Sequence, residues 1–501
     1  MLELIKNECN KIENIAITEN GAKGLKSSGS ALVDINFKVS SLRNSDEKEI
    51  ENLFEKAFNE NSEYALKWLF FARDVREGLG ERRLFRICYK KLFELNKILF
   101  YKNLNNIVEY GRWDDIVYLI GIDDEIDNHI IEIIRLQLKE DLDNLSKDEG
   151  ISLLSKWMPS ENASSKETKK MARNIIKLLN ISPRKYRLML SKLRSHSNVV
   201  ETKMCSNKWS EIDYEKVPSL ANLKYSNAFM NHDRIRRSEY LELLSKGETK
   251  INMKVATPVD IVSKYDSWYV KDLDPTLELA WKNLKKVGIE NTLVVADGSG
   301  SMTVPVSGRV TALDVANSIA IYTSENNEGI YKNKYITFSN TPKFVEFNEE
   351  DTLQEKLSIA RKYNEIANTN IERVFDLILY VAIQNNIPND EMVKNVLIIS
   401  DMEFDMAQRG WSNDIESLSK TLFDEIKDKY SKAGYTLPKL IFWNVNSRTK
   451  TIPLTENELG VALISGFSQN VLKMVMSGHY DPYEILIETI TDKRYDRIIC
   501  E

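Results

Sequence analysis

The stretch Thr292-Leu-Val-Val-Ala-Asp297-Gly-Ser-Gly-Ser301 decides the fold of the C-terminal half of this 501-residue chain. A short apolar, β-branched run that ends in a carboxylate is typical of a strand buried on both faces of a parallel sheet. Similar runs follow, separated by stretches of helical periodicity. We expect strands at 335–338, 344–347, 393–400, 439–446 and 460–464, and helices near 311–325, 350–364, 370–386 and 413–433. Because alternating strands and helices require crossover connections, residues 276–501 are predicted to form a doubly wound, Rossmann-like α/β domain.

Oxygen-bearing side chains gather where these strands end. Asp297, Ser299 and Ser301 follow the first strand, Asp401 ends a later one, and Thr369 lies in a loop just before a helix. Ligands of such sheets bind beyond the carboxyl ends of the strands, so we expect these side chains to meet. Hydroxyl and carboxylate oxygens are hard ligands that suit Mg²⁺. The sequence therefore predicts a site for Mg²⁺, with Mn²⁺ or Ca²⁺ as alternatives, against the simpler interpretation of an Asp-Gly-Ser-Gly turn without metal.

The pattern Asp-x-Ser-x-Ser, a later loop threonine and an aspartate that ends a later strand resembles the metal-ion-dependent adhesion site (MIDAS) of von Willebrand factor A (vWA) domains. The resemblance implies that Ser299 and Ser301 bind the ion directly and that Thr369 binds it directly or through water. It implies that Asp297 and Asp401 act largely through water. It also implies that an acidic residue of a partner protein completes the coordination shell.

Two positions depart from the vWA pattern, and two acidic residues lie beside it. Asn368 stands where glycine is common, and Met402 follows the candidate aspartate where glycine would be expected. Glu403 and Asp405 add negative charge near the site. We expect them to be solvated loop carboxylates rather than groups that support the metal ligands.

The N-terminal half has the periodicity of amphipathic helices. From about Asp46 to about Lys246, apolar residues recur at steps of three and four. Helices are expected at 47–60, 64–77, 81–98, 124–140, 166–179 and 183–195. Since no clean internal period appears, a strict solenoid has no support from self-similarity. Residues 1–275 are thus predicted to form an all-helical module, which makes the chain a multidomain protein.

Two motifs of this helical half carry a second resemblance. The stretches 72–82 (ARDVREGLGER) and 109–115 (EYGRWDD) resemble the TROVE module of the Ro autoantigen. A family that joins such a TROVE-like module to a vWA domain shows a similar pattern over roughly residues 30–500. The resemblance implies a HEAT-like helical repeat that closes into a ring, and RNA binding at a basic central opening and outer surface.

A basic segment gives that implication partial support from the residues themselves. Between Lys166 and Lys203 lie eleven Lys or Arg residues and two Glu residues, on a chain of net charge −6. Such a segment could track the phosphates of RNA, with Tyr186 available for base stacking. The candidate RNA-binding residues are Lys169, Lys170, Arg173, Lys177, Arg184, Lys185, Arg187, Lys192 and Arg194. The alternative is a solvated helix face, or pairing with acidic stretches of the same chain.

The arginines of the two motifs have two possible roles. Arg73, Arg76 and Arg112 could line a ring or could hold the fold through salt bridges. We favour the structural role, because carboxylates accompany each arginine. Four tryptophans at helical positions are expected in the core rather than as stacking platforms: Trp68, Trp113, Trp157 and Trp209.

Composition bounds the class of protein. The four cysteines form no CxxC pair and the four histidines form no HExxH, which fits a reduced, intracellular protein without a zinc site. The N-terminus is charged, and no window approaches the roughly 20 apolar residues of a membrane helix. We therefore expect a cytoplasmic protein that has no membrane partner and is a monomer.

Catalytic motifs are not evident in the sequence. There is no P-loop pattern, and Gly298-Ser299-Gly300 is not the nucleophile elbow of a hydrolase. We expect no enzyme activity, with a metal-dependent nuclease as the minor alternative. Two functions stay open: an RNA-binding scaffold resembling the Ro autoantigen with a metal-dependent vWA domain, or a metal-dependent protein–protein adaptor with no role in RNA binding.

Overall fold

The structure is a computed structural model. It describes residues 2–197, 199–265, 274–338, 341–363, 370–405, 420–468, 471–475 and 481–501. The chain divides into two compact units. The first, here called the sheet unit, comprises Met1–Trp68 and Ala256–Arg494. The second, the helical unit, comprises Leu69–Val255 and Tyr495–Glu501.

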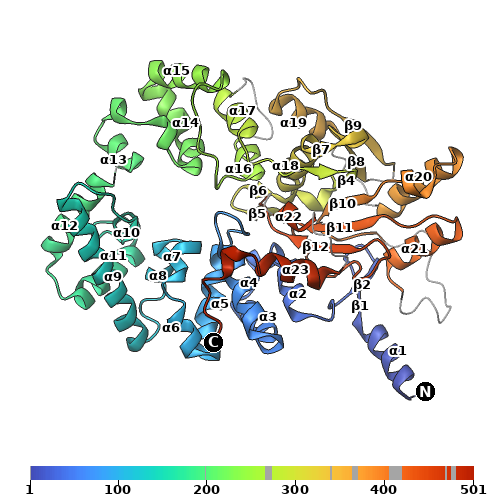
Figure 1. Cartoon of the computed structure of the whole chain (residues 1–501), viewed down its shortest axis with the longest axis horizontal. Helices are drawn as coiled ribbons and strands as arrows, with labels where there is room; N and C mark the ends of the chain where they lie inside the picture. The colour runs from blue at the N-terminus through green and yellow to red at the C-terminus, as the bar shows by residue number, and fades with distance from the viewer. Residues whose placement is uncertain are drawn as a thin grey trace. The chain divides into compact units, whose positions relative to one another are not determined.

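A six-stranded sheet forms the centre of the described part of the sheet unit. Its strand order is β12-β11-β10-β4-β8-β9 (Figure 1). The strands are β4 (Thr292–Asp297), β8 (Lys334–Phe338), β9 (Lys343–Glu346), β10 (Asn395–Ser400), β11 (Lys439–Asn444) and β12 (Val461–Ser465). All neighbouring pairs are parallel except β8 and β9, which are antiparallel. The predicted strands are confirmed, but the prediction of an all-parallel sheet is wrong at this edge, because the short link between β8 and β9 permits a hairpin and no crossover.

Helices connect and cover the strands. They are α16 (Pro258–Val262), α17 (Pro275–Lys282), α18 (Ala312–Glu325), α19 (Leu353–Lys362), α20 (Ile371–Gln384), α21 (Leu422–Lys432), α22 (Leu472–Val475) and α23 (Pro482–Ile490). α18 packs along β4, β8 and β10. It begins with a capping box in which Thr311 and Asp314 satisfy each other's backbone N–H groups. The α/β prediction is confirmed for the described residues, while part of the helix expected at 413–433 lies outside them.

The first 68 residues belong to the sheet unit. They form α1 (Leu2–Asn14), β1 (Ile15–Ile17), β2 (Lys23–Leu25), α2 (Ala31–Phe37) and α3 (Glu47–Glu60). Leu25 N donates to Ile452 O over 2.7 Å, and Asn444 Nδ2, at the end of β11, donates to Phe37 O over 2.9 Å. These bonds tie the segment to the carboxyl end of β11 and to the loop that follows it. The compact units therefore divide the chain differently from the predicted boundary between residues 275 and 276.

The helical unit is built from consecutive helices that pack on one another. α4 (Ser62–Arg73) leads into it. The helices that follow are α5 (Arg82–Leu95), α6 (Lys97–Lys102), α7 (Asn106–Tyr110), α8 (Trp113–Val117), α9 (Asp124–Ser146), α10 (Leu154–Trp157), α11 (Lys166–Leu179), α12 (Pro183–His196), α13 (Val200–Cys205), α14 (Ser219–His232) and α15 (Arg234–Ser245). Among them, α5 contacts α6, α7 contacts α8, α9 contacts α11, and α14 contacts α15. The six helices predicted for the N-terminal half, including α3 of the sheet unit, are confirmed within a few residues at most ends, although α9 runs six residues further than expected.

One of these helices ends early for a clear steric reason. α4 stops at Arg73, four residues before the predicted end. At Gly78 the backbone passes so close to the preceding turn that a Cβ would lie 2.0 Å from the carbonyl oxygen of Phe71. The chain there turns back on α4, and Leu79 N donates to the same oxygen over 3.2 Å. Glycine is required at this position because any side chain would collide with backbone.

The last residues of the chain complete the core of the helical unit. Tyr495 stacks on Tyr110 with ring centroids 5.5 Å apart, and its hydroxyl donates to Asp74 Oδ2 over 3.2 Å. Asn103 exchanges two hydrogen bonds with the backbone of Ile499, at 2.8 and 3.0 Å. The prediction that this segment belongs to the C-terminal domain is wrong, because nothing local to the segment indicates pairing with residues near position 100.

Candidate metal centre

The carboxyl ends of two neighbouring parallel strands bring the candidate ligands together. In the pairing of β4 with β10, Ala296 lies opposite Ile399, so Asp297 and Asp401 follow at the same edge of the sheet. Asp297 Oδ1 accepts a 2.9 Å hydrogen bond from Ser299 N. Asp297 Oδ2 accepts one of 2.7 Å from the hydroxyl of Ser400. The tight turn after β4 thus folds back on the carboxylate that ends the strand.

Two hydroxyl groups face these carboxylates. Ser299 Oγ and Ser301 Oγ lie 2.8 Å apart, and the Ser301 hydroxyl also hydrogen-bonds to Asp401. Both aspartates are 2% exposed and Ser299 is 6% exposed. Four of the five predicted ligands are therefore adjacent. The fifth, Thr369, lies with Asn368 outside the described residues.

Burial makes the two carboxylates unfavourable as a pair of anions. Burial first, and then repulsion by Asp401, raises the pKa of Asp297 to about 7. The pKa of Asp401 is also raised, again mainly by burial, although the Ser301 hydroxyl and Arg448 favour its charged form. A cation placed among these oxygens would relieve both desolvation and repulsion. Hydroxyls and carboxylates are the donors that Mg²⁺, Mn²⁺ and Ca²⁺ accept, so the residues fit such an ion.

The donor set is of a particular kind. No group of three or more His, Cys, Asp or Glu side chains in the described residues is arranged to hold a metal. The candidate centre combines two carboxylates with two hydroxyls instead. A site with few anionic ligands leaves a bound cation able to accept a further acidic ligand.

Glu403 was expected to be a solvated loop carboxylate, and this prediction is wrong. Its side chain is 1% exposed. Oε1 accepts hydrogen bonds from Arg448 N and Thr449 N, both at 2.8 Å, and from the Ser447 hydroxyl at 3.2 Å. Oε2 accepts one of 2.8 Å from Glu19 N. Glu403 therefore fixes two loops, one from the N-terminal segment and one that follows β11, around the candidate centre.

The residue after Asp401 adopts a conformation that favours glycine. Met402 has φ +62° and is fully buried, and its N–H donates to the Ser400 hydroxyl over 3.0 Å. Glycine adopts this left-handed conformation most easily, because it has no Cβ. In this chain, packing and the hydrogen bond hold a methionine in the same shape.

Arg448 is a member of the site that the sequence analysis missed. Its Nη2 lies 3.4 Å from Asp401 Oδ2 and 2.6 Å from Glu19 Oε2. The side chain is 35% exposed, so solvent and ligands can reach the guanidinium. A single arginine after a strand, in Asn-Val-Asn-Ser-Arg-Thr, carries no distinguishing pattern, and its position depends on the buried bonds to Glu403.

The basic segment lies on α11, α12 and α13 of the helical unit. Arg187 pairs with Glu161, and Arg194 donates to Ser155 O, Ser160 Oγ and Met158 O at 2.7–2.9 Å. The remaining candidates, together with Lys166, form no ion pair with any described residue: Lys169, Lys170, Arg173, Lys177, Arg184, Lys185 and Lys192. Arg194 holds the α10 turn, and its role in RNA binding stays a prediction.

The basic residues of α11 share one face of the helix. Their spacing of three, four, seven and eleven residues from Lys166 places Lys169, Lys170, Arg173 and Lys177 along one stripe, while Ala172, Ile175, Ile176 and Leu179 are buried. Tyr186 is fully buried, and its hydroxyl donates to Pro159 O over 2.7 Å. The predicted stacking role of Tyr186 is therefore wrong, because the ring belongs to the core.

The arginines of the two motifs hold the fold. Arg73 is 1% exposed and binds Asp115 through Nη2 at 2.7 Å and Nε at 2.9 Å. Arg86 Nε contacts the other oxygen of Asp115 at 2.8 Å. Arg112 stacks over Trp157, with 4.9 Å from the guanidinium carbon to the ring centroid. The structural interpretation is confirmed for Arg73, while Arg76 is half-exposed and contacts Glu109 at 3.6 Å.

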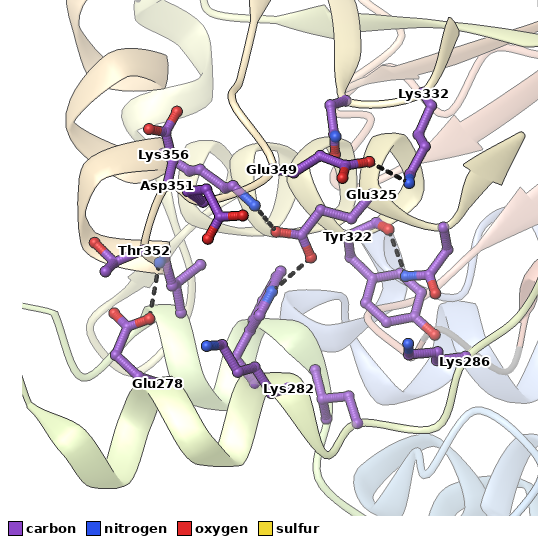
Figure 2. Close-up of a pocket in the computed structure, with 16 residues that line it drawn as sticks. Glu278, Lys282, Lys286, Tyr322, Glu325, Lys332, Glu349, Asp351, Thr352 and Lys356 are labelled. Carbon is purple, nitrogen blue, oxygen red and sulfur yellow. Dashed lines mark hydrogen bonds and ion pairs between the residues drawn. The ribbon is translucent and has the colours of Figure 1, made fainter. Parts of the chain in front are cut away.

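A separate polar cavity of about 490 Å³ lies in the sheet unit (Figure 2). On its floor, Glu325 accepts hydrogen bonds from Trp281 Nε1 at 2.7 Å and from Lys356 Nζ at 2.6 Å. Glu278 accepts one of 2.8 Å from Leu353 N at the start of α19. Because these carboxylates already have hydrogen-bond partners within the protein, we assign no site to the cavity.

Cysteines and membrane spans give no further site. Cys9 and Cys205 are exposed, Cys88 is buried and Cys500 is partly buried, and all four are free thiols. Within the described ranges, no helix combines the length and the apolar character needed to cross a bilayer.

Comparison with known proteins identifies relatives along the whole chain. A family model described as "Domain of unknown function (DUF2828)" matches residues 18–121 and 128–296, and one described as "Domain of unknown function (DUF7788)" matches residues 291–495. An uncharacterized protein, L728, of Acanthamoeba polyphaga mimivirus is 33% identical over 518 aligned residues, which cover 95% of this chain and 87% of the relative. The crystal structure of the Deinococcus radiodurans Ro (RSR) protein aligns with 97% of this chain and 99% of its own, at 12% identity and a TM-score of 0.38. A likeness at that score supports no inference about function.

Proposed function

The chain belongs to the family described as "Domain of unknown function (DUF2828)", and we propose its function from its own residues. It is a non-catalytic scaffold whose sheet unit binds a divalent cation. Through this ion, the sheet unit binds an acidic group of a partner protein. The observation that carries this proposal is the pair of buried carboxylates, Asp297 and Asp401, facing the hydroxyls of Ser299 and Ser301. The resemblance of the sequence pattern to the adhesion site of vWA domains supports the proposal.

Mg²⁺ is the proposed ion, with Mn²⁺ or Ca²⁺ as alternatives. Ser299 and Ser301 would hold it directly and Thr369 directly or through water, while Asp297 and Asp401 supply negative charge. The bound ion would offer an electrophilic coordination position to a ligand carboxylate. The protein's own part is to desolvate the two aspartates, orient the hydroxyls through the turn after β4, and keep the strand ends in register.

Titration calorimetry with Mn²⁺ tests the metal site. The native chain should bind about one equivalent, and Ser301→Ala or Asp297→Asn should weaken binding by at least tenfold, as each removes a group beside the ion. The matched control is Ser358→Ala, which removes an exposed hydroxyl group on α19 that is not a candidate ligand. A native chain that binds no Mn²⁺, or variants that bind as tightly as the native chain, would overturn the proposal.

RNA binding by the helical unit is a second proposed function. The observation that favours it is the stripe of unpaired Lys and Arg side chains along α11. Phosphate contacts release counterions, so affinity should fall steeply as salt rises. The absence of that dependence would leave the sheet unit's role as a protein adaptor.

A gel-shift titration with structured RNA at ~0.15 M salt tests this role. The double variant Lys170→Glu/Arg173→Glu should lose most of the affinity and reduce the salt slope by about 2, which corresponds to two phosphate contacts. The control is Lys139→Glu, which reverses the charge of an exposed lysine on α9. Cleavage of the labelled RNA that depends on Mg²⁺ and on Asp297 would contradict the non-catalytic assignment and favour a nuclease.

A further inference from the structure

The loop after β11 is held beside the candidate centre by its backbone. Arg448 N and Thr449 N both donate to Glu403 Oε1 over 2.8 Å, and the Thr449 hydroxyl contacts both oxygens of the same carboxylate at 3.0 and 2.9 Å. Lys450 follows in a left-handed conformation, with φ +57°, and its N–H donates to the Ser447 hydroxyl over 2.8 Å. The position of the loop is therefore fixed without any contribution from the Arg448 side chain.

The N-terminal segment is anchored to the same strand end. Glu19 N donates to Glu403 Oε2 over 2.8 Å, and Asn20 Nδ2 donates to Glu403 O over 2.6 Å. The Thr18 hydroxyl donates to Phe404 O over 2.7 Å. Because backbone and neighbouring side chains hold this segment, the Glu19 side chain is free to serve another purpose. It is 53% exposed.

The Arg448 guanidinium lies between two carboxylates of different kinds. Nη2 is 2.6 Å from Glu19 Oε2 and 3.4 Å from Asp401 Oδ2. Asp401 is buried and belongs to the candidate centre. Glu19 belongs to the N-terminal segment, and its exposed carboxylate reaches the guanidinium from the solvent side. A guanidinium presents its donors in a planar fork that matches the two oxygens of a carboxylate. The short contact is thus made to a carboxylate that is easily displaced.

We propose that Arg448 is a ligand-binding residue of the metal centre, that it selects a carboxylate of the partner, and that Glu19 occupies it in the unliganded chain as an intrachain substitute. This inference rests on the proposed metal-dependent function. It adds a second anchor beside the ion and a competitor built into the same unit. The ion pair of a solvent-accessible arginine contributes little stability. Arg448 is held next to Asp401 by the hydrogen bonds of the loop backbone to Glu403.

The test uses the full chain saturated with Mn²⁺ and a synthetic peptide, acetyl-Gly-Asp-Gly-amide, as the probe. Broadening of the peptide's NMR signals by bound Mn²⁺ reports its affinity. Arg448→Gln should weaken peptide binding by about tenfold or more, the loss expected for charge-assisted hydrogen bonds. Glu19→Gln should tighten it by roughly threefold to fivefold, because an exposed competing ion pair is removed. The peptide with Asn in place of Asp should not bind.

The controls separate this inference from the proposed function. Lys432→Gln removes one exposed positive charge at the end of α21 and should leave peptide affinity unchanged. Calorimetry should show that Arg448→Gln binds Mn²⁺ at least as tightly as the native chain, since a cation beside Asp401 has been removed. A native chain without Mn²⁺ binding refutes the metal centre itself. Normal Mn²⁺ binding with equal peptide affinity in all variants, or no peptide binding even by Glu19→Gln, refutes the role of Arg448.

Discussion

Asp115 gives the sharpest prediction about stability. Its side chain is 0% exposed, and it accepts hydrogen bonds from Arg73 Nε and Nη2, from Arg86 Nε and from Arg112 N at 2.7–3.1 Å. Asp115→Asn keeps the shape but removes the charge and turns an amide NH₂ toward an arginine donor. Since Arg73 is also buried, its charge would lose its counterion in a region shielded from bulk solvent. Breaking such a buried pair costs roughly 3–5 kcal/mol.

The neighbouring aspartate supplies the control. Asp114 is 20% exposed and pairs with Arg86 at 2.9 Å and with Arg82, itself 54% exposed, at 3.5 Å. Because solvent screens this pair, Asp114→Asn should cost about 1 kcal/mol or less. The two variants carry the same chemical change at adjacent positions and differ in burial. Their difference therefore measures what burial adds.

Hydrogen exchange followed by mass spectrometry resolves the effect in the helical unit alone. In Asp115→Asn, the amides of α5 that exchange by opening of the unit should lose protection by roughly 100-fold to 5000-fold. In Asp114→Asn the loss should be about fivefold or less. Equal effects of the two substitutions would refute the reasoning, because they would show that the ion pair of Asp115 is not desolvated.

Other residues offer equally direct tests. Saturating Mg²⁺ should raise the thermal midpoint of the sheet unit in calorimetry, because a ligand at 100 times its Kd adds about 2.7 kcal/mol to the free energy of unfolding. A rise of the same size in Asp297→Ala would contradict the site. Glu403→Gln should destabilise the two loops by about 2–4 kcal/mol, since in either orientation its NH₂ faces backbone N–H groups. Exchange of the amides at 18–22 and 447–449 measures this, with Glu456→Gln, the same change at an exposed glutamate, as the control, and unchanged exchange would show that Glu403 does not hold the loops. Tyr186→Phe should cost about 1 kcal/mol through the lost bond to Pro159 and leave RNA affinity in gel shifts unchanged; a drop in affinity would mean that the hydroxyl contacts RNA.

The parts of the fold that local patterns determine could be predicted from the sequence. β4 is buried along its whole length and β10 at every residue after Asn395, so their apolar runs are easily recognised; Asp297 ends the first and Asp401 follows the second. The amphipathic spacing of α11 predicted its bounds and the face that carries its basic residues. Asp297, Ser299 and Ser301 were predicted to meet because a turn of five residues leaves them little freedom.

The parts that depend on long-range register could not be predicted. Glu403 is buried because N–H groups from positions 19, 448 and 449 converge on it, and no local pattern announces such partners. Arg448 reaches Asp401 only because β11 lies beside β10 in the sheet. The Tyr186 ring looks available for stacking in a basic sequence, yet the helical period places it on the buried side together with Leu190 and Leu193.

Each of the two units combines segments that are far apart in the sequence, and this affects how the chain folds during its synthesis. Residues 1–68 are synthesised before the sheet that receives them, whose first strand begins at Thr292. At roughly 5–20 residues per second, the roughly two hundred intervening residues take on the order of tens of seconds to synthesise. During that interval the apolar face of α2 has no sheet to cover it, and the helical unit still lacks Tyr495. Neither unit can therefore complete its core until the later segments that belong to it have been synthesised.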